Sequence, residues 1–316
     1  MTGLFIGVDT SNYTTSVSCV STEGIVFERR TMLSVPLGER GLRQSDAVFQ
    51  HVRNLPPLIQ AMLEAIDGKT VQAVGFSATP TGAAESYMPV FLAGKLAATA
   101  IASSLNVPLY EATHQAGHVR AAMFGQEEAV SENPFLAMHL SGGTTDLLLM
   151  QREKGLVGNI DRIGGCSDLH AGQFVDRVGV ALGLPFPSGI HLEELALQSK
   201  MQETKLPSSV QDLNCSFSGQ ESQCQRLIAS GADHAEIAFA VYDCMARTFA
   251  KLLNNAFTKS GCKTALLSGG VSGSILLREL LQERMHTKLL YAESGLSADN
   301  AVGTALLARD RHLNGR

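Results

Sequence analysis

Apolar and polar positions alternate in short runs over the first thirty residues, a pattern that predicts β-strands. The segment "FIGVDTSNYTTSVSCVSTEGIVFERR" reads as strand, polar turn, strand, glycine turn and strand. A second segment of this kind, "FLAMHLSGGTTDLLLMQREKGLVGNI", begins at Phe135. The two align at a single shift of 130 positions (144 − 14 = 130), which pairs Ser11 with Ser141 and Thr14 with Thr144. The match favours a duplicated unit, although two unrelated hairpins would produce a similar pattern.

Longer segments with an apolar residue every three or four positions follow each set of strands and predict helices. The first half has helical patterns in "DAVFQHVRNLPPLIQAMLEAI" and "VFLAGKLAATAIASSL", and strand patterns in "VQAVGFSA" and "VPLYEA". The second half has helical patterns in "AGQFVDRVGVALGL", "HAEIAFAVYDCMARTFAKLLNNAFTKSG" and "SILLRELLQER", strands in "KTALLSGG" and "KLLYA", and a final helix from Asp299. Strands that alternate with helices predict a sheet covered on both faces, hence an α/β protein.

The organisation predicts two lobes that meet at a cleft. The polar segment "GQEEAVSENP" separates the two halves of the pattern, so we place an N-terminal lobe at residues 1–125 and a C-terminal lobe at residues 126–316. The final helix, from about residue 299, is expected to pack back at the cleft.

Composition narrows the class of protein. The chain has 316 residues, of which 45% are hydrophobic and 17% charged, enough for two full cores. A net charge of −5 gives no overall attraction to nucleic acid, so an RNA contact would need a local patch or a partner. The chain shows no secretory signal pattern and no apolar run that could span a bilayer. Six cysteines without a CxxC pair are expected to be reduced thiols, which indicates a cytoplasmic protein with no membrane segment.

Two histidines lie four residues apart in "YEATHQAGHVRAAMFG". Thr113 is suited to cap a helix that begins at His114, and the spacing places His114 and His118 on one helix face. Metal ligands use this spacing, but so do histidines of surfaces and satisfied cores, and the spacing alone leaves both readings open. A zinc protease of the HExxH type is excluded, because Gln115 stands where the catalytic glutamate is needed.

Three polar or glycine-rich turns lie where predicted strands end. They are "LSGGTTD" at residues 140–146, "LLSGGVSGS" at residues 266–274, which opens a predicted helix, and "DTSNYTTS", which begins at Asp9. Backbone amides in such turns, and at a helix N-terminus, are suited to bind phosphate. Three of them in a duplicated α/β protein predict a nucleotide cleft. Neither a Walker A motif nor GxGxxG is present, which argues against a P-loop ATPase and a nicotinamide dehydrogenase.

Taken in order, these motifs resemble the TsaD/Kae/YgjD family, once described as sialoglycoprotein endopeptidases (peptidase M22), within the actin, Hsp70 and hexokinase superfamily. The resemblance covers nearly the whole chain, through "IGVDTSNYTTSV", "HQAGH", "LSGGTTDLLL", "HAGQFVDRVGVALGLPFPSG", "CSFSG", "LSGGVSGSILLREL" and "SADNAVGTA". It implies a duplicated, ribonuclease H-like fold of two actin-like lobes with a central nucleotide cleft. The activity that it implies is transfer of a threonylcarbamoyl group from an acyl-adenylate to the adenosine next to the tRNA anticodon.

The resemblance also implies the residues of the site. His114, His118 and Asp299 match the family's metal ligands, which would hold one divalent ion, Fe²⁺, Zn²⁺ or Mg²⁺. Asp176 and Gly189 match residues of the pocket for ATP or the acyl-adenylate, with Asp176 accepting from the ribose hydroxyls. The other residues that match this pocket are His139, Leu140, Ser141, Gly142, Gly143, Thr144, Gly269, Gly270 and Ser274.

The chain departs from the family pattern around the implied cleft. The family's E-T-S-C-D-E-T becomes D-T-S-N-Y-T-T, so an acidic pair associated with catalysis is missing, and only Asp9 and Thr14 are left as catalytic candidates there. The family's S-G-G-H-T-Q becomes "SGGTTD". The substitutions are Asn12, Tyr13 and Thr14 for Cys, Asp and Glu, Thr144 for His, Ser274 for Asn, and Glu221 for Lys. These changes alter proton transfer and local charge, and they indicate a divergent paralogue.

Two classes of function therefore remain. The first is a metal-dependent threonylcarbamoyl or carbamoyl transferase that acts on tRNA or a related acceptor, together with a TsaB-type or other protein partner. With the acidic pair gone, it would need substrate-assisted proton transfer. The second is a non-catalytic, ATPase-like nucleotide-binding module that works through a protein partner. A small-molecule kinase is disfavoured, because the first lobe shows no recognisable catalytic aspartate.

Overall fold

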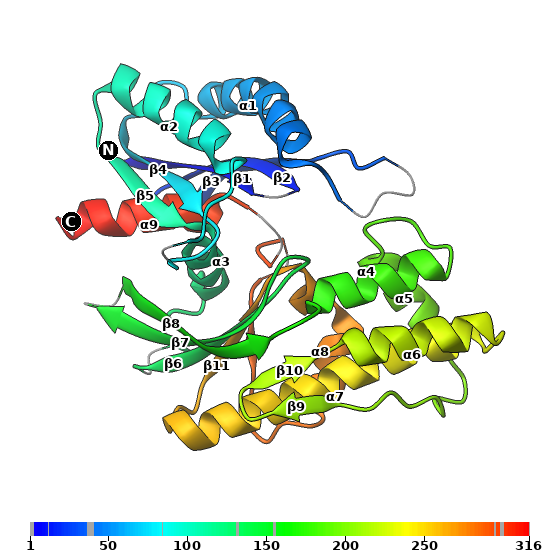
Figure 1. The fold of residues 1–316 in the computed structure, drawn as a ribbon. Helices are drawn as coiled ribbons and strands as arrows, with labels where there is room; N and C mark the ends of the chain where they lie inside the picture. Colours follow the sequence, from blue (N-terminus) through cyan, green and yellow to red (C-terminus); the bar gives the residue numbers. More distant parts are fainter. Residues whose placement is uncertain are drawn as a thin grey trace. The chain divides into compact units, whose positions relative to one another are not determined.

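The computed structural model describes residues 3–11, 13–36, 41–83, 85–130, 133–153, 156–293, 295–297 and 300–315. The chain forms two compact α/β units (Figure 1). The first comprises residues 1–125, 153–157 and 298–316, and the second comprises residues 126–152 and 158–297. The C-terminal segment thus groups with the first unit, whereas the sequence pattern placed it in the second lobe. The reason is packing, since the final helix α9 (Val302–Leu313) lies against the first unit's sheet.

The first unit is a five-stranded sheet in the order β3-β2-β1-β4-β5. Its strands are β1 (Leu4–Ser11), β2 (Thr14–Val20), β3 (Ile25–Met32), β4 (Val71–Thr79) and β5 (Leu109–Thr113). The first three are antiparallel, as the alternating pattern predicted, and β1, β4 and β5 run parallel. Parallel strands require crossover helices, and α1 (Gln44–Ala65) and α2 (Phe91–Leu105) supply them on one face (Figure 1).

The two faces of β1 are buried against different partners. Leu4, Ile6 and Val8 belong to the core that contains side chains of α1 and α2. The alternate positions face α9, and there a Cβ at Gly7 would overlap the carbonyl oxygen of Ala301. Because side chains alternate along a strand, Asp9 lies on the same face as Gly7. Helix α9 can approach this face closely only because the strand has glycine there.

The second unit is a seven-stranded sheet in the order β12-β11-β6-β7-β8-β10-β9. Its strands are β6 (Phe135–Leu140), β7 (Thr145–Glu153), β8 (Leu156–Cys166), β9 (Ser209–Gln211), β10 (Asn214–Ser216), β11 (Ala265–Ser268) and β12 (Leu290–Tyr291). Its helices are α4 (Ala171–Ala181), α5 (Gly189–Ala196), α6 (Ser218–Ala229), α7 (His234–Ser260) and α8 (Ile275–Gln282). The core lies between the sheet and α7, which buries sixteen of its residues.

The strand orders confirm the duplication expected from the sequence repeat. In each unit an antiparallel hairpin, β1–β2 or β6–β7, lies beside two parallel strands, β4–β5 or β11–β12. The second unit adds β10 and β9 beyond β8. In the part of the chain that the structure describes, no helix combines the length and apolar character needed to cross a membrane. All six cysteines are free and buried.

Candidate functional site

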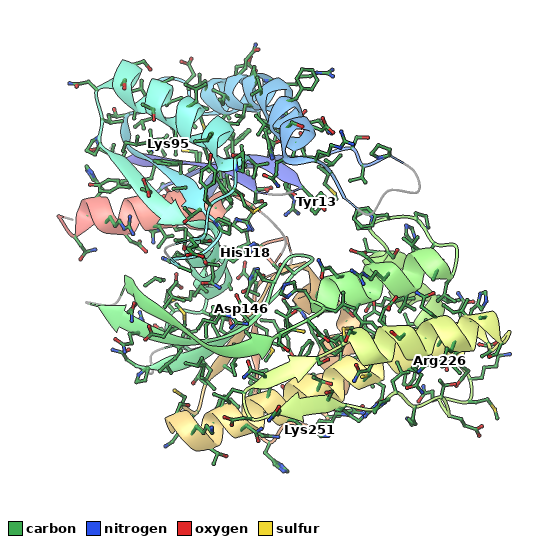
Figure 2. All side chains as sticks on the ribbon, in the orientation of Figure 1. Tyr13, Lys95, His118, Asp146, Arg226 and Lys251 are labelled. Atoms are coloured by element: carbon green, nitrogen blue, oxygen red, sulfur yellow. The ribbon has the colours of Figure 1, made fainter. Side chains whose placement is uncertain are left out.

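Helix α3 (His114–Met123) carries the two histidines that the sequence predicted as metal ligands. The hydroxyl of Thr113 accepts a hydrogen bond from the amide of Ala116 at 3.1 Å, which caps the helix as predicted. The helix therefore begins at His114, directly after β5, and His118 follows one turn later on the same face (Figure 2).

The two imidazoles of α3 point at each other. Nε2 of His118 lies 2.9 Å from Nε2 of His114, and the rings meet edge-on with centroids 4.4 Å apart. Two nitrogens bound to one ion at about 2.1 Å lie roughly 3.0–3.4 Å apart in octahedral or tetrahedral geometry. The pair therefore has nearly the separation of two ligands on one metal, and His118 is only 3% exposed.

A buried carboxylate lies behind the first histidine. Oδ1 of Asp9, on β1, is 3.1 Å from Nδ1 of His114, and the Asp9 side chain has no exposed surface. A carboxylate in this position accepts from the Nδ1–H group and leaves Nε2 with the lone pair that a metal needs. The sequence offered Asp9 as a catalytic candidate, and the structure places it as the neighbour of a predicted metal ligand.

The third predicted ligand, Asp299, lies outside the described residues, and so does Asn12 of the first loop. Among the residues that are described, no group of three histidine, cysteine, aspartate or glutamate side chains is arranged to hold a metal. The helix that follows Asp299 is nevertheless fixed against α3. A Cβ at Gly303 of α9 would overlap the carbonyl oxygen of Gly117 of α3.

An ion pair adds to this contact between α3 and α9. Nε of Arg120 donates to Oδ2 of Asp310 at 2.7 Å, with both side chains less than a tenth exposed. The histidine helix and the helix after Asp299 are thus held together by close backbone packing and by a buried salt bridge.

A third histidine of the first unit was not singled out from the sequence. His51 of α1 is fully buried, and its Nδ1 lies 2.8 Å from the hydroxyl of Thr15, which also accepts from Asn54 at 3.2 Å. Burial, partly opposed by the charge of Asp9, lowers the pKa of His51 to about 4. His51 is therefore neutral at pH 7. In the sequence, His51 resembles the other polar residues of an amphipathic helix. Its distinguishing feature is the contact with Thr15 of β2, which depends on the tertiary fold.

The first glycine-rich loop of the second unit is closed on itself. The hydroxyl of Ser141 accepts from the amides of Gly143 and Thr144 at 3.3 and 3.1 Å and lies 2.8 Å from Oγ1 of Thr144. Helix α4 packs directly on this loop, because a Cβ at Gly172 would lie 2.6 Å from Cα of Gly142. The loop is therefore rigidly placed over the start of α4.

Two more predicted pocket residues are Asp176, within α4, and Gly189, at the start of α5. Oδ1 of Asp176 accepts from the amide of Ser188 at 2.7 Å, and burial, partly opposed by this bond, raises the pKa of Asp176. The carbonyl oxygen of the next residue, Gly189, accepts from the hydroxyl of Tyr242 at 2.9 Å. These bonds fix the turn between α4 and α5 and hold the Asp176 carboxylate at its edge.

The second glycine-rich loop begins where β11 ends. Gly269 has a φ of 89°, and a Cβ there would overlap the carbonyl oxygen of Leu140, so the two loops touch at their bases. His139 of β6 pairs in register with Ser268 of β11, and Nδ1 of His139 lies 3.2 Å from the Ser268 hydroxyl. Gly270 opens a 3₁₀ turn that leads to α8.

The N-terminus of α8 already has acceptors for two of its free amides. The hydroxyl of Ser274 accepts from Leu277 at 3.1 Å, and Oε1 of Glu193, on α5, accepts from Leu276 at 2.7 Å. The sequence predicted an anion at these amides, and the chain's own carboxylate bonds one of them. Glu193 gave no sequence signal, because a glutamate on a short helix is ordinary.

The replaced positions of the family pattern have ordinary local roles where they are described. Thr14 begins β2 and is 6% exposed, and the carbonyl oxygen of Tyr13 accepts from the amide of Leu33 at 2.8 Å. Glu221 of α6 accepts from Gln225 at 2.9 Å. The predicted metal residues that are described therefore lie in the first unit, and all predicted pocket residues lie in the second.

The sequence of this chain matches a known protein family. A family model described as "TsaD: tRNA N6-adenosine threonylcarbamoyltransferase" matches residues 37–306. A protein of Neorickettsia sennetsu named tRNA N6-adenosine threonylcarbamoyltransferase is 27% identical over 319 residues, covering 98% of this chain and 93% of the relative.

Solved structures show the same fold at low sequence identity. HypF of T. kodakarensis superposes with a TM-score of 0.65 at 15% identity, over 99% of this chain and 48% of that protein. A ROK family glucokinase from Streptomyces griseus, solved with glucose and AMPPNP, superposes with a TM-score of 0.54 at 14% identity, over 98% of this chain and 100% of that protein. The fold is therefore the actin-like and hexokinase-like fold that the motifs predicted.

Proposed function

Because this chain belongs to the TsaD family, we propose that it transfers a threonylcarbamoyl group to an adenosine of tRNA. The observation that carries the proposal is the histidine pair of α3, with Nε2 atoms 2.9 Å apart and Asp9 bonded to the first ring. A buried carboxylate–histidine arrangement of this kind is typical of a metal ligand that is held in one tautomer. A protein that modifies tRNA in this way would act in the cytoplasm.

We propose that His114, His118 and Asp299 hold one divalent ion. Two imidazole nitrogens favour Fe²⁺ or Zn²⁺ over Mg²⁺, which prefers oxygen ligands. When bound, the ion would supply Lewis-acid polarisation of the acyl carbonyl. Asp9 keeps the Nδ1–H of His114 bonded, and the Arg120–Asp310 pair holds α3 against the helix that follows Asp299.

In the second unit, we propose that an acyl-adenylate, or ATP, binds at the loop Ser141–Thr144 and at the loop from Gly269. Asp176 lies at the edge of this region with Oδ1 bonded to the amide of Ser188, which leaves Oδ2 to accept from ribose hydroxyls. Tyr13 and Thr14 replace the acidic pair in the first loop, and Thr14 is buried, so proton transfer would be assisted by the substrate.

A protein partner is favoured by exposed apolar side chains on two neighbouring helices. On α1, Phe49 and Val52 are 61% and 52% exposed, and on α2, Leu92 and Leu96 are 50% and 71% exposed. These helices pack against each other on one face of the first sheet (Figure 1). The same surface supports the second candidate function, a nucleotide-binding module that acts through a TsaB-type or other partner without transferring a group itself.

The test is a transfer assay with purified protein, threonylcarbamoyl-adenylate and unmodified tRNA, read by nucleoside mass spectrometry. Fe²⁺ or Zn²⁺ is added, and parallel tubes contain the partner proteins of an active family member. We expect modified adenosine from the wild type and none from His114→Ala. If a family enzyme is active in the same tube and this protein makes no product, the transferase proposal fails. Retained ATP affinity would then favour the binding module.

A further inference from the structure

A charged cluster beside the loop Ser141–Thr144 has no role in the function proposed above. It consists of Asp146 near the start of β7, Arg162 near the end of the neighbouring strand β8, and His170 directly before α4. We propose that Arg162 and His170, with Arg162 oriented by Asp146, form a binding site for a phosphate group of a small nucleotide. The proposal deepens the proposed function, on whose nucleotide pocket it rests.

Asp146 binds the guanidinium of Arg162 from one side only. Nε of Arg162 donates to Oδ1 of Asp146 at 2.6 Å, and the carboxylate is buried at 6% exposure, whereas the arginine side chain is 48% exposed. Nη2 has a further, long bond of 3.4 Å to the carbonyl oxygen of Cys166. A buried acid that fixes Nε fixes the plane of the group and leaves the outer N–H donors available to solvent. Such an arginine is prepared to bind two oxygens of one phosphate.

The alternation of side chains along β7 and β8 explains why Asp146 and Arg162 lie on the face of the sheet opposite the core. Leu147 of β7 belongs to the core against α7, and Ile163 of β8 packs against the same core. Because side chains alternate along a strand, their neighbours Asp146 and Arg162 stand on the opposite face of the sheet. Figure 2 shows Asp146 at the end of β7 that adjoins the glycine-rich loop.

His170 adds a titratable donor to the cluster. The charged groups that act on it are Asp146 of β7, Arg162 of β8, and Asp168 of the connection to α4. Burial holds the pKa of His170 below its usual value, with the carboxylates raising it and the arginine lowering it. Nδ1 of His170 is buried, and the His170 side chain forms a capping box with Gln173 at the start of α4. A phosphate beside the ring would favour the imidazolium, so binding would draw a proton onto His170.

The loop Ser141–Thr144 has few free backbone amides that could donate to a phosphate. Of the four amides in Ser141–Thr144, three are bonded inside the loop, at 2.9, 3.3 and 3.1 Å. Open space nevertheless lies over Gly142 and Gly143, where an added Cβ would meet nothing within 4 Å. A ligand can therefore approach the loop closely, but side chains must supply most of the hydrogen bonds to a phosphate.

The N-terminus of α8 is another place where a phosphate could bind, but two of its free amides already have acceptors. At α8 the amides of Leu276 and Leu277 are bonded by Glu193 and Ser274. A phosphate there would have to displace a carboxylate of the same charge. Position 146 is also one at which the family pattern has Gln, so the Asp146–Arg162 pair belongs to the part of this chain that diverges.

The test measures binding by calorimetry with three probes: ATP, inorganic pyrophosphate and adenosine. Arg162→Gln and His170→Gln are compared with the wild type and with two matched controls, Arg226→Gln on α6 and His286→Gln before β12, both exposed. We expect Arg162→Gln to weaken ATP and pyrophosphate about ten- to a hundred-fold, the usual effect of losing hydrogen bonds to a charged group. Adenosine binding and both controls should be unchanged, and thermal melts check that each variant folds.

A pH series tests His170 separately. As the pH falls from 8 to 6, the ATP affinity of the wild type should rise relative to that of His170→Gln, because the bound state holds the extra proton. The variant also serves as the reference for protonation of the nucleotide itself. Identical pH dependence in the two proteins would overturn the role of His170.

The remaining outcomes separate this site from the proposed transferase. Pyrophosphate binding that depends on Arg162, in a protein without transferase activity, supports the phosphate site and counts against the transferase. Equal losses for ATP and adenosine indicate a structural effect and overturn the site, as does a wild type that binds neither ATP nor pyrophosphate. Unchanged ATP and pyrophosphate binding in Arg162→Gln overturns the site.

Discussion

Oδ1 of Asp9 lies 3.1 Å from Nδ1 of His114, so a fully buried carboxylate on β1 is bonded to the first residue of α3. The two residues are 105 positions apart in the sequence. They meet because α3 begins directly after β5, at the edge of the sheet, and Asp9 lies on the face of that sheet that packs against α9. The contact gives His114 a fixed tautomer, and from this follows the first prediction.

Removal of the Asp9 carboxylate should weaken metal binding while the histidine pair remains. We expect Asp9→Ala to lower the affinity for Zn²⁺ or Co²⁺ about 10- to 100-fold, the usual cost of losing the partner of a ligating histidine. The measurement is a titration that follows Co²⁺ absorption with competition by Zn²⁺. Asp67→Asn, an exposed aspartate of the same unit, is the control. Equal affinities for wild type and Asp9→Ala would show that this carboxylate does not support a metal.

The close approach of α3 and α9 predicts a large effect of one methyl group. In Gly303→Ala the new Cβ would overlap the carbonyl oxygen of Gly117, so the helices must separate. We expect a loss of about 1–3 kcal/mol in the free energy of unfolding, as for other overpacked contacts, measured by urea denaturation. Gly219→Ala, in α6 with open space around the site, should be neutral or stabilising by up to about 1 kcal/mol. A neutral Gly303→Ala would contradict the packing described here.

His51 should make stability depend on pH. Its pKa is about 4 in the folded protein and near 6.5 in the unfolded chain, so the unfolded state binds more protons between these values. Stability is therefore full above about pH 6.5 and falls as the pH decreases toward 4, by about 3 kcal/mol at most. Urea denaturation of the wild type and His51→Gln from pH 8 to 4 measures the effect. The wild type should lose up to about 3 kcal/mol of stability relative to His51→Gln as the pH falls from 7 to 4. Parallel curves would show that His51 is not responsible.

Asp168 predicts a pH dependence in a lower range. Burial alone would raise its pKa, but hydrogen bonds from the hydroxyl of Ser216 and from the amides of Phe217, Ser218 and Leu169 outweigh it and hold the pKa well below its usual value. A depressed carboxyl pKa contributes stability above the unfolded pKa of about 3.9, and this is lost as the pH falls further.

Asp168→Asn should therefore be less stable than the wild type at neutral pH, with a difference that narrows below about pH 4. Acid titration of both proteins, followed by circular dichroism, measures this. Asp161→Asn, which changes an exposed aspartate of β8, is the matched control. A difference that stays constant down to pH 2 would mean that the carboxylate acts by shape and not by charge.

Local patterns predicted the elements that depend on local chemistry. The hairpin of β1 and β2, the amphipathic α1 and α7, and the Thr113 cap of α3 each lie in one continuous segment, and each was recognisable there. Helix α5 and the paired strands β9 and β10 were not predicted. They are only eight, three and three residues long, and β10 exists because it pairs with β8 far away in the sequence.

The residues of the candidate site likewise divide into those that the sequence predicted and those that depend on tertiary contacts. The spacing of His114 and His118 is a property of one helical turn and was visible in the sequence. The partners of the site were not, because Glu193 bonds Leu276 across 83 positions and His51 meets Thr15 across 36. Arg162 and Asp146, 16 positions apart, meet only because β7 and β8 are neighbours in the sheet. Such contacts depend on the tertiary fold, and no periodicity encodes them.

The contact between Gly117 and Gly303 also constrains the length of the chain. An α-helix turns about 100° per residue, so one residue inserted between Val302 and Gly303 would rotate the start of α9 against the rest of the helix. Gly303 and the buried Asp310 would then keep their places on α3 only if the residues ahead of them turned away instead. The number of residues between Gly303 and Asp310 is thus as strictly determined as their identities, and deletion of one residue between them should not be tolerated.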